Sequence, residues 1–248
     1  MAVASAAIGA VLPLVGSIIA ASAGNPPKAR KHHTDAPLLL FTHHHATTLL
    51  AGAIVLGLGA IPIALALRYL FDATKFRHPA QPRIALYAAL VGAGAILVTR
   101  LAFQIVVNKK SADFAINPAN FAAGSRHAEA VAKHLLASGG VSITGAAGYA
   151  GGLALGFAFV MISLNAMRAG LLTRFMGIIG IFSGILFVLP VIPLPVVQSF
   201  WLGALAFLFA GRWPSGLPPA WESGQAEPWP SQQELREARE RGETAAPG

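Results

Sequence analysis

The residue with the clearest chemical potential is Arg100, which lies in an otherwise uncharged apolar run from 84 to 107. A guanidinium inside an apolar helix is costly unless it reaches water, a lipid headgroup or a partner, so a functional role is the default hypothesis. Gln104 follows one turn later, and none of the apolar runs contains Asp or Glu. We therefore expect Arg100 either to snorkel toward the interface or to bind an anionic ligand or lipid, with Gln104 beside it.

Histidines form the second group of candidates, centred on the run His43, His44 and His45. Imidazole binds zinc, copper and nickel, and histidines on neighbouring loops could converge on one ion. Adjacent residues of a helix point about 100° apart, however, so three consecutive rings cannot reach one metal from a regular backbone. The pattern predicts a polar boundary or a pH-sensitive cluster, with a metal site as the alternative. The histidines of the neighbouring loops are His32, His33, His127 and His134.

Uncharged polar side chains within the apolar runs are the third group, and Asn165 is their candidate for ligand binding. Hydrogen bonds between helices explain these residues, and a permeation path is the alternative. Catalysis finds little support, because the chain has no G-x-S-x-G, HExxH or Walker A motif and no acid in its apolar runs. An enzyme is therefore the third functional hypothesis. Besides Asn165, the uncharged polar side chains within the apolar runs are Thr144, Tyr149, Ser163, Gln198 and Ser199.

Composition shows what surrounds these residues. Hydrophobic residues make up 55% of the 248 and charged residues 11%, whereas soluble domains carry about 25% charged residues. Long apolar runs without alternation favour helices over barrel strands. The chain has no cysteine, and its net charge of +8 comes largely from basic residues in short loops, so anionic lipid is a better partner than nucleic acid.

The apolar runs predict an all-α polytopic membrane helix bundle over 1–211, with about six transmembrane helices. A secretory signal peptide is the competing interpretation of residues 1–23, although no positive charge precedes its apolar run. Residues 212–248 are expected to form a cytosolic tail. The predicted helices are 2–22, 47–70, 84–107, 145–167, 173–190 and 193–211.

Glycines recur at every fourth position in two of these helices: Gly148, Gly152 and Gly156, and then Gly180 and Gly184. Such a stripe lets two helix backbones approach closely in lipid. We therefore expect these residues to pack helices together, either within the chain or between two copies of it.

Two further segments lie outside the apolar runs. Residues 120–136 form an amphipathic pattern, expected to lie along the membrane surface or to pack on the helix ends. The tail carries Trp213, Trp221 and Trp229, which suggest a strap at the interface. Ser231 to Glu234 match a capping box that opens a short charged helix.

Six helices place both termini on one side of the membrane. The link between the last two helices is uncharged, whereas Arg168, Arg174 and Arg212 lie at the opposite ends of those helices. The positive-inside rule then predicts that both termini are cytoplasmic. The basic loops 24–36 and 108–138 would lie outside, against the same rule.

Two stretches resemble an uncharacterised family of multi-pass membrane proteins from high-GC Gram-positive bacteria. They are SLNAMRAGLLTRFMG at 163–177 and GRWPSGLPPAWE at 211–222. The likeness is specific over 145–230 and implies that 163–177 is a helix–turn–helix connection at a membrane face. It implies no activity.

The function we expect from the sequence is that of a non-enzymatic component of a bacterial cell membrane, which binds lipid, a membrane protein or a second copy of itself. The alternative is a small transporter or channel for an uncharged or anionic solute. Neither hypothesis requires a cofactor.

Overall fold

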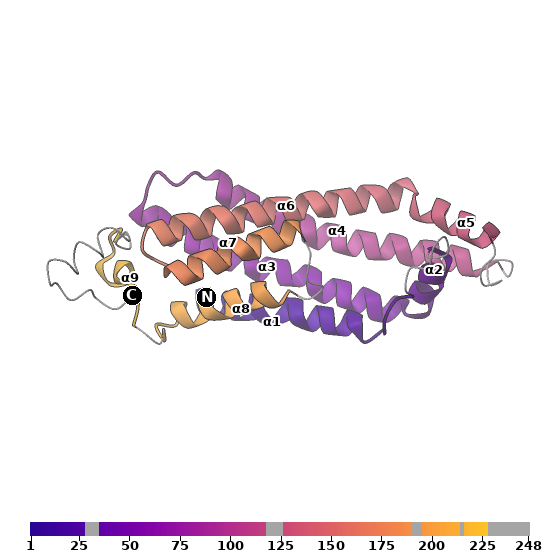
Figure 1. Cartoon of the computed structure of the whole chain (residues 1–248), viewed down its shortest axis with the longest axis horizontal. Coiled ribbons are helices and arrows are strands. Elements are labelled where there is room, and N and C mark those ends of the chain that lie inside the picture. Colours follow the sequence, from indigo (N-terminus) through magenta and orange to yellow (C-terminus); the bar gives the residue numbers. More distant parts are fainter. Residues whose placement is uncertain (28–34, 118–125, 190–194, 214–215, 228–248) are drawn as a thin grey trace, which may run out of the picture.

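The computed structural model describes residues 1–27, 35–117, 126–189, 195–213 and 216–227, and within them every regular element is a helix. Four of these helices are long and apolar enough to cross a membrane, and they run side by side as rods (Figure 1). The predicted all-α membrane bundle is confirmed. The four are α1 (Ala2–Ala21), α3 (Ala46–Arg77), α4 (Ile84–Ala115) and α6 (Gly139–Arg168).

Helices α3 and α4 are longer than their apolar runs. Each has 32 residues, which is about 48 Å of helix against about 30 Å of hydrocarbon. Charged residues end an apolar run without ending a helix, so α3 continues past Arg68 until the loop that contains Pro79. The predicted boundaries at 70 and 107 therefore mark the edge of the apolar run rather than the end of the helix.

The fifth and sixth predicted helices form a shorter hairpin of α7 (Arg174–Val188) and α8 (Val196–Phe209). Their 15 and 14 residues measure about 22 and 21 Å. Helix α7 packs on α6 and α8 packs on α1. Figure 1 shows that the hairpin accompanies the long helices over only part of their length. The stretch 163–177 is a helix–turn–helix connection, as the resemblance implied.

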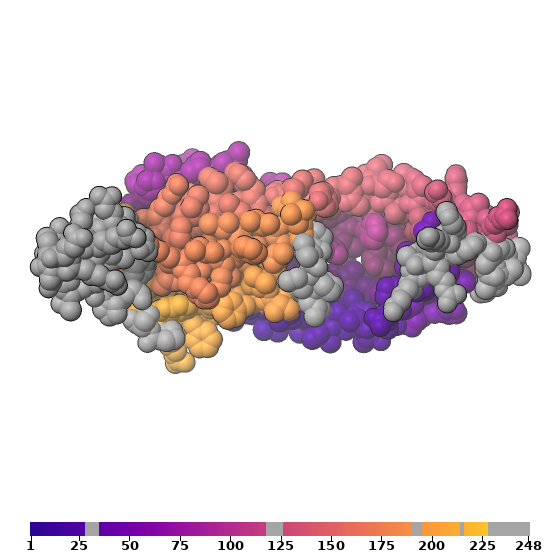
Figure 2. Space-filling model, viewed as in Figure 1, coloured from indigo at the N-terminus to yellow at the C-terminus, as the bar shows by residue number. Residues whose placement is uncertain are grey.

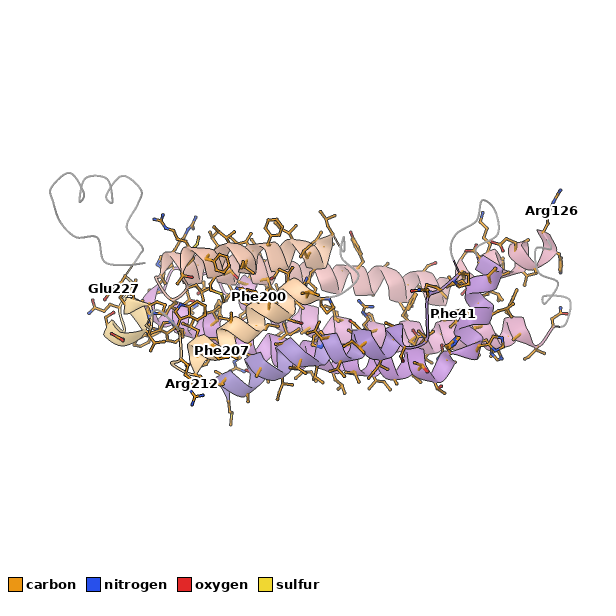
Figure 3. All side chains as sticks on the ribbon, turned by 60° about the horizontal axis from the view of Figure 1, so that its bottom comes forward. Phe41, Arg126, Phe200, Phe207, Arg212 and Glu227 are labelled. Carbon is orange, nitrogen blue, oxygen red and sulfur yellow. The ribbon has the colours of Figure 1, made fainter. Side chains whose placement is uncertain are left out.

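The core lies where the hairpin meets α6. Trp201 is fully buried, stacks obliquely on Phe159 at 5.2 Å between ring centroids, and donates a hydrogen bond from Nε1 to the Met176 carbonyl at 2.8 Å. On the outer face of α8, Phe200 and Phe207 are 56% and 61% exposed and project from the bundle (Figure 3). This apolar outer face is suited to lipid.

At one end of the bundle, a strap containing α9 (Pro219–Ser223) joins three helix ends. Trp221 Nε1 donates to the Leu171 carbonyl at 2.8 Å, and Arg77 Nε donates to the Ala220 carbonyl at 2.6 Å. The strap predicted from Trp213 and Trp221 is therefore an ordered contact. Trp229 and the predicted charged helix after Ser231 lie outside the described residues.

At the opposite end, α2 (Asp35–His44) and α5 (Arg126–Leu136) pack together on the end of α4. The apolar face of α5 contributes Ala128 and Ala132 to a cluster with Leu39 and Phe114. The amphipathic segment thus packs on the helix ends, and its residues 120–125 lie outside the described part. Arg126 projects from α5 at this end (Figure 3).

Glu129 of α5 fixes the start of α2. Its carboxylate accepts hydrogen bonds from the backbone N–H groups of Asp35 and Ala36, at 2.7 and 3.1 Å. These are amides that the helix itself leaves unpaired, and a carboxylate also suits the positive end of the helix dipole. The side chain therefore caps a helix that is more than 90 residues away in the chain.

Candidate functional site

Arg100 lies on the side of α4 that faces the interior of the bundle. Thr99 packs against α6, because a Cβ atom added at Gly148 would lie 3.1 Å from the Thr99 hydroxyl. Leu97 packs against α3, where a Cβ atom at Gly57 would lie 3.2 Å from its methyl group. At about 100° per residue, position 100 falls between these two contact faces.

The residues that share this inward stripe with Arg100 are buried. Ala89 and Ala93 precede it by whole turns and are 0% and 4% exposed; Val107 and Ser111 follow it and are 9% and 0% exposed. Arg100 itself is exposed. An exposed side chain within a buried stripe means that the bundle is open at this level.

The opening follows from the short hairpin. The Tyr149 hydroxyl on α6 donates a hydrogen bond to the carbonyl of Val188, the last residue of α7, at 3.0 Å. Gly152 of α6 faces the Phe187 carbonyl, and Gly151 faces Ala95, so α7 ends about level with Ala95 on α4. Arg100 lies five residues, or about 7.5 Å, further along. Figure 2 shows a hollow at this place, between α6 and α1 beyond the hairpin, with α4 behind it.

The depth of Arg100 can be estimated from the helix crossings. Leu97 lies opposite Gly57 on α3, and Gly52 lies against Ala20 near the end of α1. Because α3 and α4 are antiparallel, Arg100 is level with residue 54 and about 5 Å inside the end of α1. Helix α1 has 20 residues, about the thickness of the hydrocarbon. The arginine is therefore close to one membrane interface, within the reach of a headgroup.

Within the described residues, Arg100 has no hydrogen-bond or ion-pair partner. An arginine that only snorkelled could occupy the lipid-facing side of α4, where Val98 is 64% exposed. Arg100 instead places five N–H donors in an interior hollow, and a guanidinium matches phosphate or carboxylate with two parallel hydrogen bonds.

Gln104 and Asn108 continue a polar row from Arg100 toward the α2 end. The Gln104 side-chain amide donates to Asn108 Oδ1 at 2.8 Å, and the Asn108 amide donates to the Ala46 carbonyl at 3.1 Å. With spacings of four residues, the three side chains lie on one side of α4 over about 12 Å. The structure thus brings the predicted pair Arg100 and Gln104 together, and Asn108 is a member that the sequence analysis did not name.

Asn165 does not belong to this site. It is 6% exposed, and its amide donates to the Met161 carbonyl of its own helix at 2.7 Å. It lies 16 residues from Tyr149, or about 24 Å along α6 toward the α9 end. Asn165 therefore satisfies its amide locally, away from the hollow.

The three histidines do not converge. His43 and His44 are exposed at the end of α2 with ring centroids 5.8 Å apart, whereas His45 Nδ1 lies 2.9 Å from the Phe41 carbonyl. In the described part of the chain, no three His, Asp or Glu side chains gather where they could hold a metal ion. The metal site considered at His43, His44 and His45 is not supported, because consecutive helical positions separate the rings. His32 and His33 lie outside the described residues.

The predicted packing glycines all lie at contacts within this chain. Gly148 faces Thr99 of α4, and Gly152 faces the Phe187 carbonyl of α7. Gly156 and Gly184 meet at the crossing of α6 and α7, and Gly180 lies against Ser163 and Trp201. The stripes are therefore occupied by intramolecular packing.

Three hydroxyls between the hairpin and its neighbours are buried without a hydrogen-bond partner among the described residues: Ser163, Ser183 and Ser199. Near them, the Gln198 amide lies 3.5 Å from the Ser183 carbonyl. Ser163, Gln198 and Ser199 were predicted as polar groups of the bundle from the sequence, whereas Ser183 was not. Ordered water is a common partner for such groups.

The fold and the site together define an integral membrane protein with a cationic hollow close to one interface. Comparisons of the chain with family models, with curated proteins and with solved structures find no match.

Proposed function

We propose that the protein is a non-enzymatic component of a bacterial cell membrane that binds an anionic lipid, with Arg100 as the ligand of the headgroup. One observation carries the proposal: Arg100 is exposed and lacks a described partner on the inward stripe of α4. A charge held close to hydrocarbon gains most from a counter-charge. The membrane itself supplies that counter-charge as anionic lipid.

The position of the hollow supports a lipid rather than a soluble anion. The hollow lies between two membrane-crossing helices, α1 and α6 (Figure 2), and Arg100 is about 5 Å inside the end of α1. A lipid can present its phosphate at this depth while its chains remain in hydrocarbon. The glycine stripes pack against helices of the same chain, so they are not free to pair with a second copy. Lipid is therefore a better supported partner than a second copy of the protein.

The proposed orientation follows from the ends of the helices. Helix α1 begins, and α8 and α9 end, toward the same end of the bundle (Figure 1), which also carries Arg168, Arg174 and Arg212. We place this end in the cytoplasm by the positive-inside rule. The hollow then belongs to the outer half of the membrane. Membership in the bacterial family that 163–177 and 211–222 resemble is part of the same proposal.

Transport of a small anion is the second candidate, and the polar row favours it. Arg100, Gln104 and Asn108 lead from the hollow to the α2 end of the bundle. A solute could approach Arg100 along this row. Reconstituted protein would then move a small anion across vesicles, and the movement would depend on Arg100.

Thermal unfolding in detergent with added lipid tests the proposal. At a lipid concentration about 100 times the dissociation constant, binding stabilises by about 2.7 kcal/mol, or about 5–10 °C for a chain of this size. We expect phosphatidylglycerol to produce this shift and phosphatidylcholine to produce little. Arg100→Leu should abolish the shift.

Arg83→Leu is the matched control, because Arg83 is an exposed arginine at the start of the same helix. It should keep the shift with phosphatidylglycerol. An equal shift in Arg100→Leu and the parent chain would contradict the proposal. If reconstituted protein moved a small anion across vesicles and Arg100→Leu abolished that movement, the transport hypothesis would replace the lipid-binding proposal. If Arg100→Leu fails to fold, Arg100→Gln carries the same comparison.

A further inference from the structure

Resting on the proposed lipid site, we infer that Gln104 selects the headgroup. The bound lipid is an anionic phosphodiester whose headgroup carries a hydroxyl, such as phosphatidylglycerol. Arg100 holds the phosphate, and Gln104 Oε1 accepts a hydrogen bond from the hydroxyl. The two side chains together recognise the charge of the headgroup and its hydrogen-bond donor.

The orientation of the Gln104 amide is fixed by two hydrogen bonds that begin on α3. The Ala46 carbonyl can only accept a hydrogen bond, so Asn108 turns its Nδ2 atom toward it, at 3.1 Å. Asn108 Oδ1 then faces Gln104, which turns its Nε2 atom toward that oxygen, at 2.8 Å. Flipping either amide would set two acceptors against each other, so the network assigns both orientations.

This orientation leaves Gln104 Oε1 as a free acceptor. The side chain is half-buried, and no described residue donates a hydrogen bond to Oε1. Because Nε2 is directed at Asn108 on the α2 side, the oxygen on the same carbon is turned away from Asn108. An amide oxygen without a donor beside hydrocarbon costs free energy. A donor from a ligand beside α4 would remove that cost.

Arg100 lies one turn before Gln104 on the same side of α4. Residues four apart in a helix have Cβ atoms about 5–6 Å apart, so one small group can contact both side chains. Among the described residues, neither side chain takes the other as a partner. Arg100 supplies only donors and Gln104 Oε1 only an acceptor. A group that complements both therefore contains an anionic oxygen and a donor, as a phosphodiester with a hydroxyl does.

The order of the two residues along α4 matches the order of groups in a phospholipid. Gln104 is about 6 Å nearer than Arg100 to the α2 end of the bundle, where the closer membrane interface lies. In a phospholipid the phosphate lies nearer to hydrocarbon than the rest of the headgroup, so a headgroup hydroxyl extends from Arg100 toward Gln104. The choline of phosphatidylcholine has no N–H or O–H group and would leave Gln104 Oε1 unpaired.

Titration with two anionic lipids that differ in the hydroxyl tests this assignment. Phosphatidylglycerol and phosphatidylethanol carry the same phosphodiester charge, but the ethyl headgroup has no hydrogen-bond donor. The full chain in detergent is titrated with each lipid, with identical acyl chains, and the apparent dissociation constant is taken from the thermal shift. We expect the parent chain to bind phosphatidylglycerol about fivefold more tightly, which is the effect of one hydrogen bond.

Two variants separate the selection of the headgroup from a structural role of the polar row. Gln104→Met keeps the length of the side chain and removes the acceptor. It should weaken binding of phosphatidylglycerol about fivefold and leave phosphatidylethanol unchanged, whereas a general loss of stability would affect both lipids alike. Asn108→Ala keeps Gln104 but removes the group that orients its amide. It should reduce the same preference, and it carries the test if Gln104→Met fails to fold.

The outcomes distinguish this inference from the proposed function. Equal binding of both lipids by the parent chain, lost in Arg100→Leu, would overturn the role of Gln104 and leave the Arg100 site standing. Binding of neither lipid, or equal binding in Arg100→Leu and the parent, would overturn the lipid site itself. Glycerol phosphate without lipid is the third probe. An equal Arg100-dependent shift with this probe would make the occupant a soluble phosphate ester and overturn the assignment to lipid.

Discussion

Replacing Gly156 by alanine should force α6 and α7 apart. A Cβ atom at Gly156 would lie 2.6 Å from the Gly184 carbonyl oxygen, and one at Gly184 would lie 2.5 Å from the Gly156 carbonyl oxygen. Both obstacles are backbone atoms, so no side chain can rotate away. Ordinary contact begins at about 3.4 Å, and the helices must therefore separate by roughly 0.8 Å.

The expected loss of stability is the difference between two effects. Overpacking of a close contact costs about 1–3 kcal/mol. Alanine recovers up to about 1 kcal/mol through its higher helix propensity. With that gain subtracted in full, the net destabilisation is up to about 2 kcal/mol, which corresponds to a fall of up to about 8 °C in Tm for a chain of this length.

Thermal unfolding in detergent, followed by tryptophan fluorescence, measures this effect, because the buried Trp201 packs on α6 beside the same crossing. Gly94→Ala is the control: Gly94 lies in α4, and an added Cβ atom would meet nothing within 4 Å. That variant should keep or raise Tm. If Gly156→Ala were as stable as Gly94→Ala, the close crossing of α6 and α7 would be wrong.

Three further substitutions test the two ends of the bundle. Gly170 has φ +76° and faces the Glu227 carbonyl, so Gly170→Ala should cost about 1–2 kcal/mol and speed proteolytic removal of the tail; an unchanged rate would contradict the strap contact. Trp221→Phe loses the hydrogen bond to the Leu171 carbonyl, and Tm should fall by the equivalent of about 1 kcal/mol. Glu129→Ala uncaps α2 at a cost of about 1 kcal/mol, and hydrogen exchange of the first two α2 amides should quicken, whereas a capping role would be refuted by equal exchange.

The fold could be predicted because lipid imposes a simple condition on the chain. Every backbone group must be paired within hydrocarbon, so uncharged runs of about 20 residues become helices. The starts of α1 and α4 agree with the predicted runs at 2 and 84. The ends of α3 and α4 and the start of α6 extend beyond theirs, because a helix can continue after its apolar run has ended; α3 stops only two residues before Pro79.

The candidate site could be predicted only in part. Arg100 stands out because a lone charge in an apolar run is costly wherever it points. Its inward direction could not be predicted, because in a membrane the outer face is as apolar as the core and the helical periodicity of hydrophobicity disappears. Val98 and Ala93 are both apolar, yet one is 64% exposed and the other 4%.

Contacts between distant segments were beyond the sequence altogether. The cap of α2 by Glu129 joins positions more than 90 residues apart. The hollow depends on where α7 ends relative to α4, and this level is set by the crossing of Gly156 with Gly184. A single sequence contains no record of which glycines meet.

The lipid retained by the purified protein tests the central claim most directly. The chain is reconstituted with equal amounts of phosphatidylglycerol and phosphatidylcholine and examined by native mass spectrometry as the parent, Arg100→Leu and Arg83→Leu. We predict that the parent and Arg83→Leu retain phosphatidylglycerol in preference to phosphatidylcholine, and that Arg100→Leu retains neither in preference. The same preference in all three proteins would show that Arg100 does not hold the lipid.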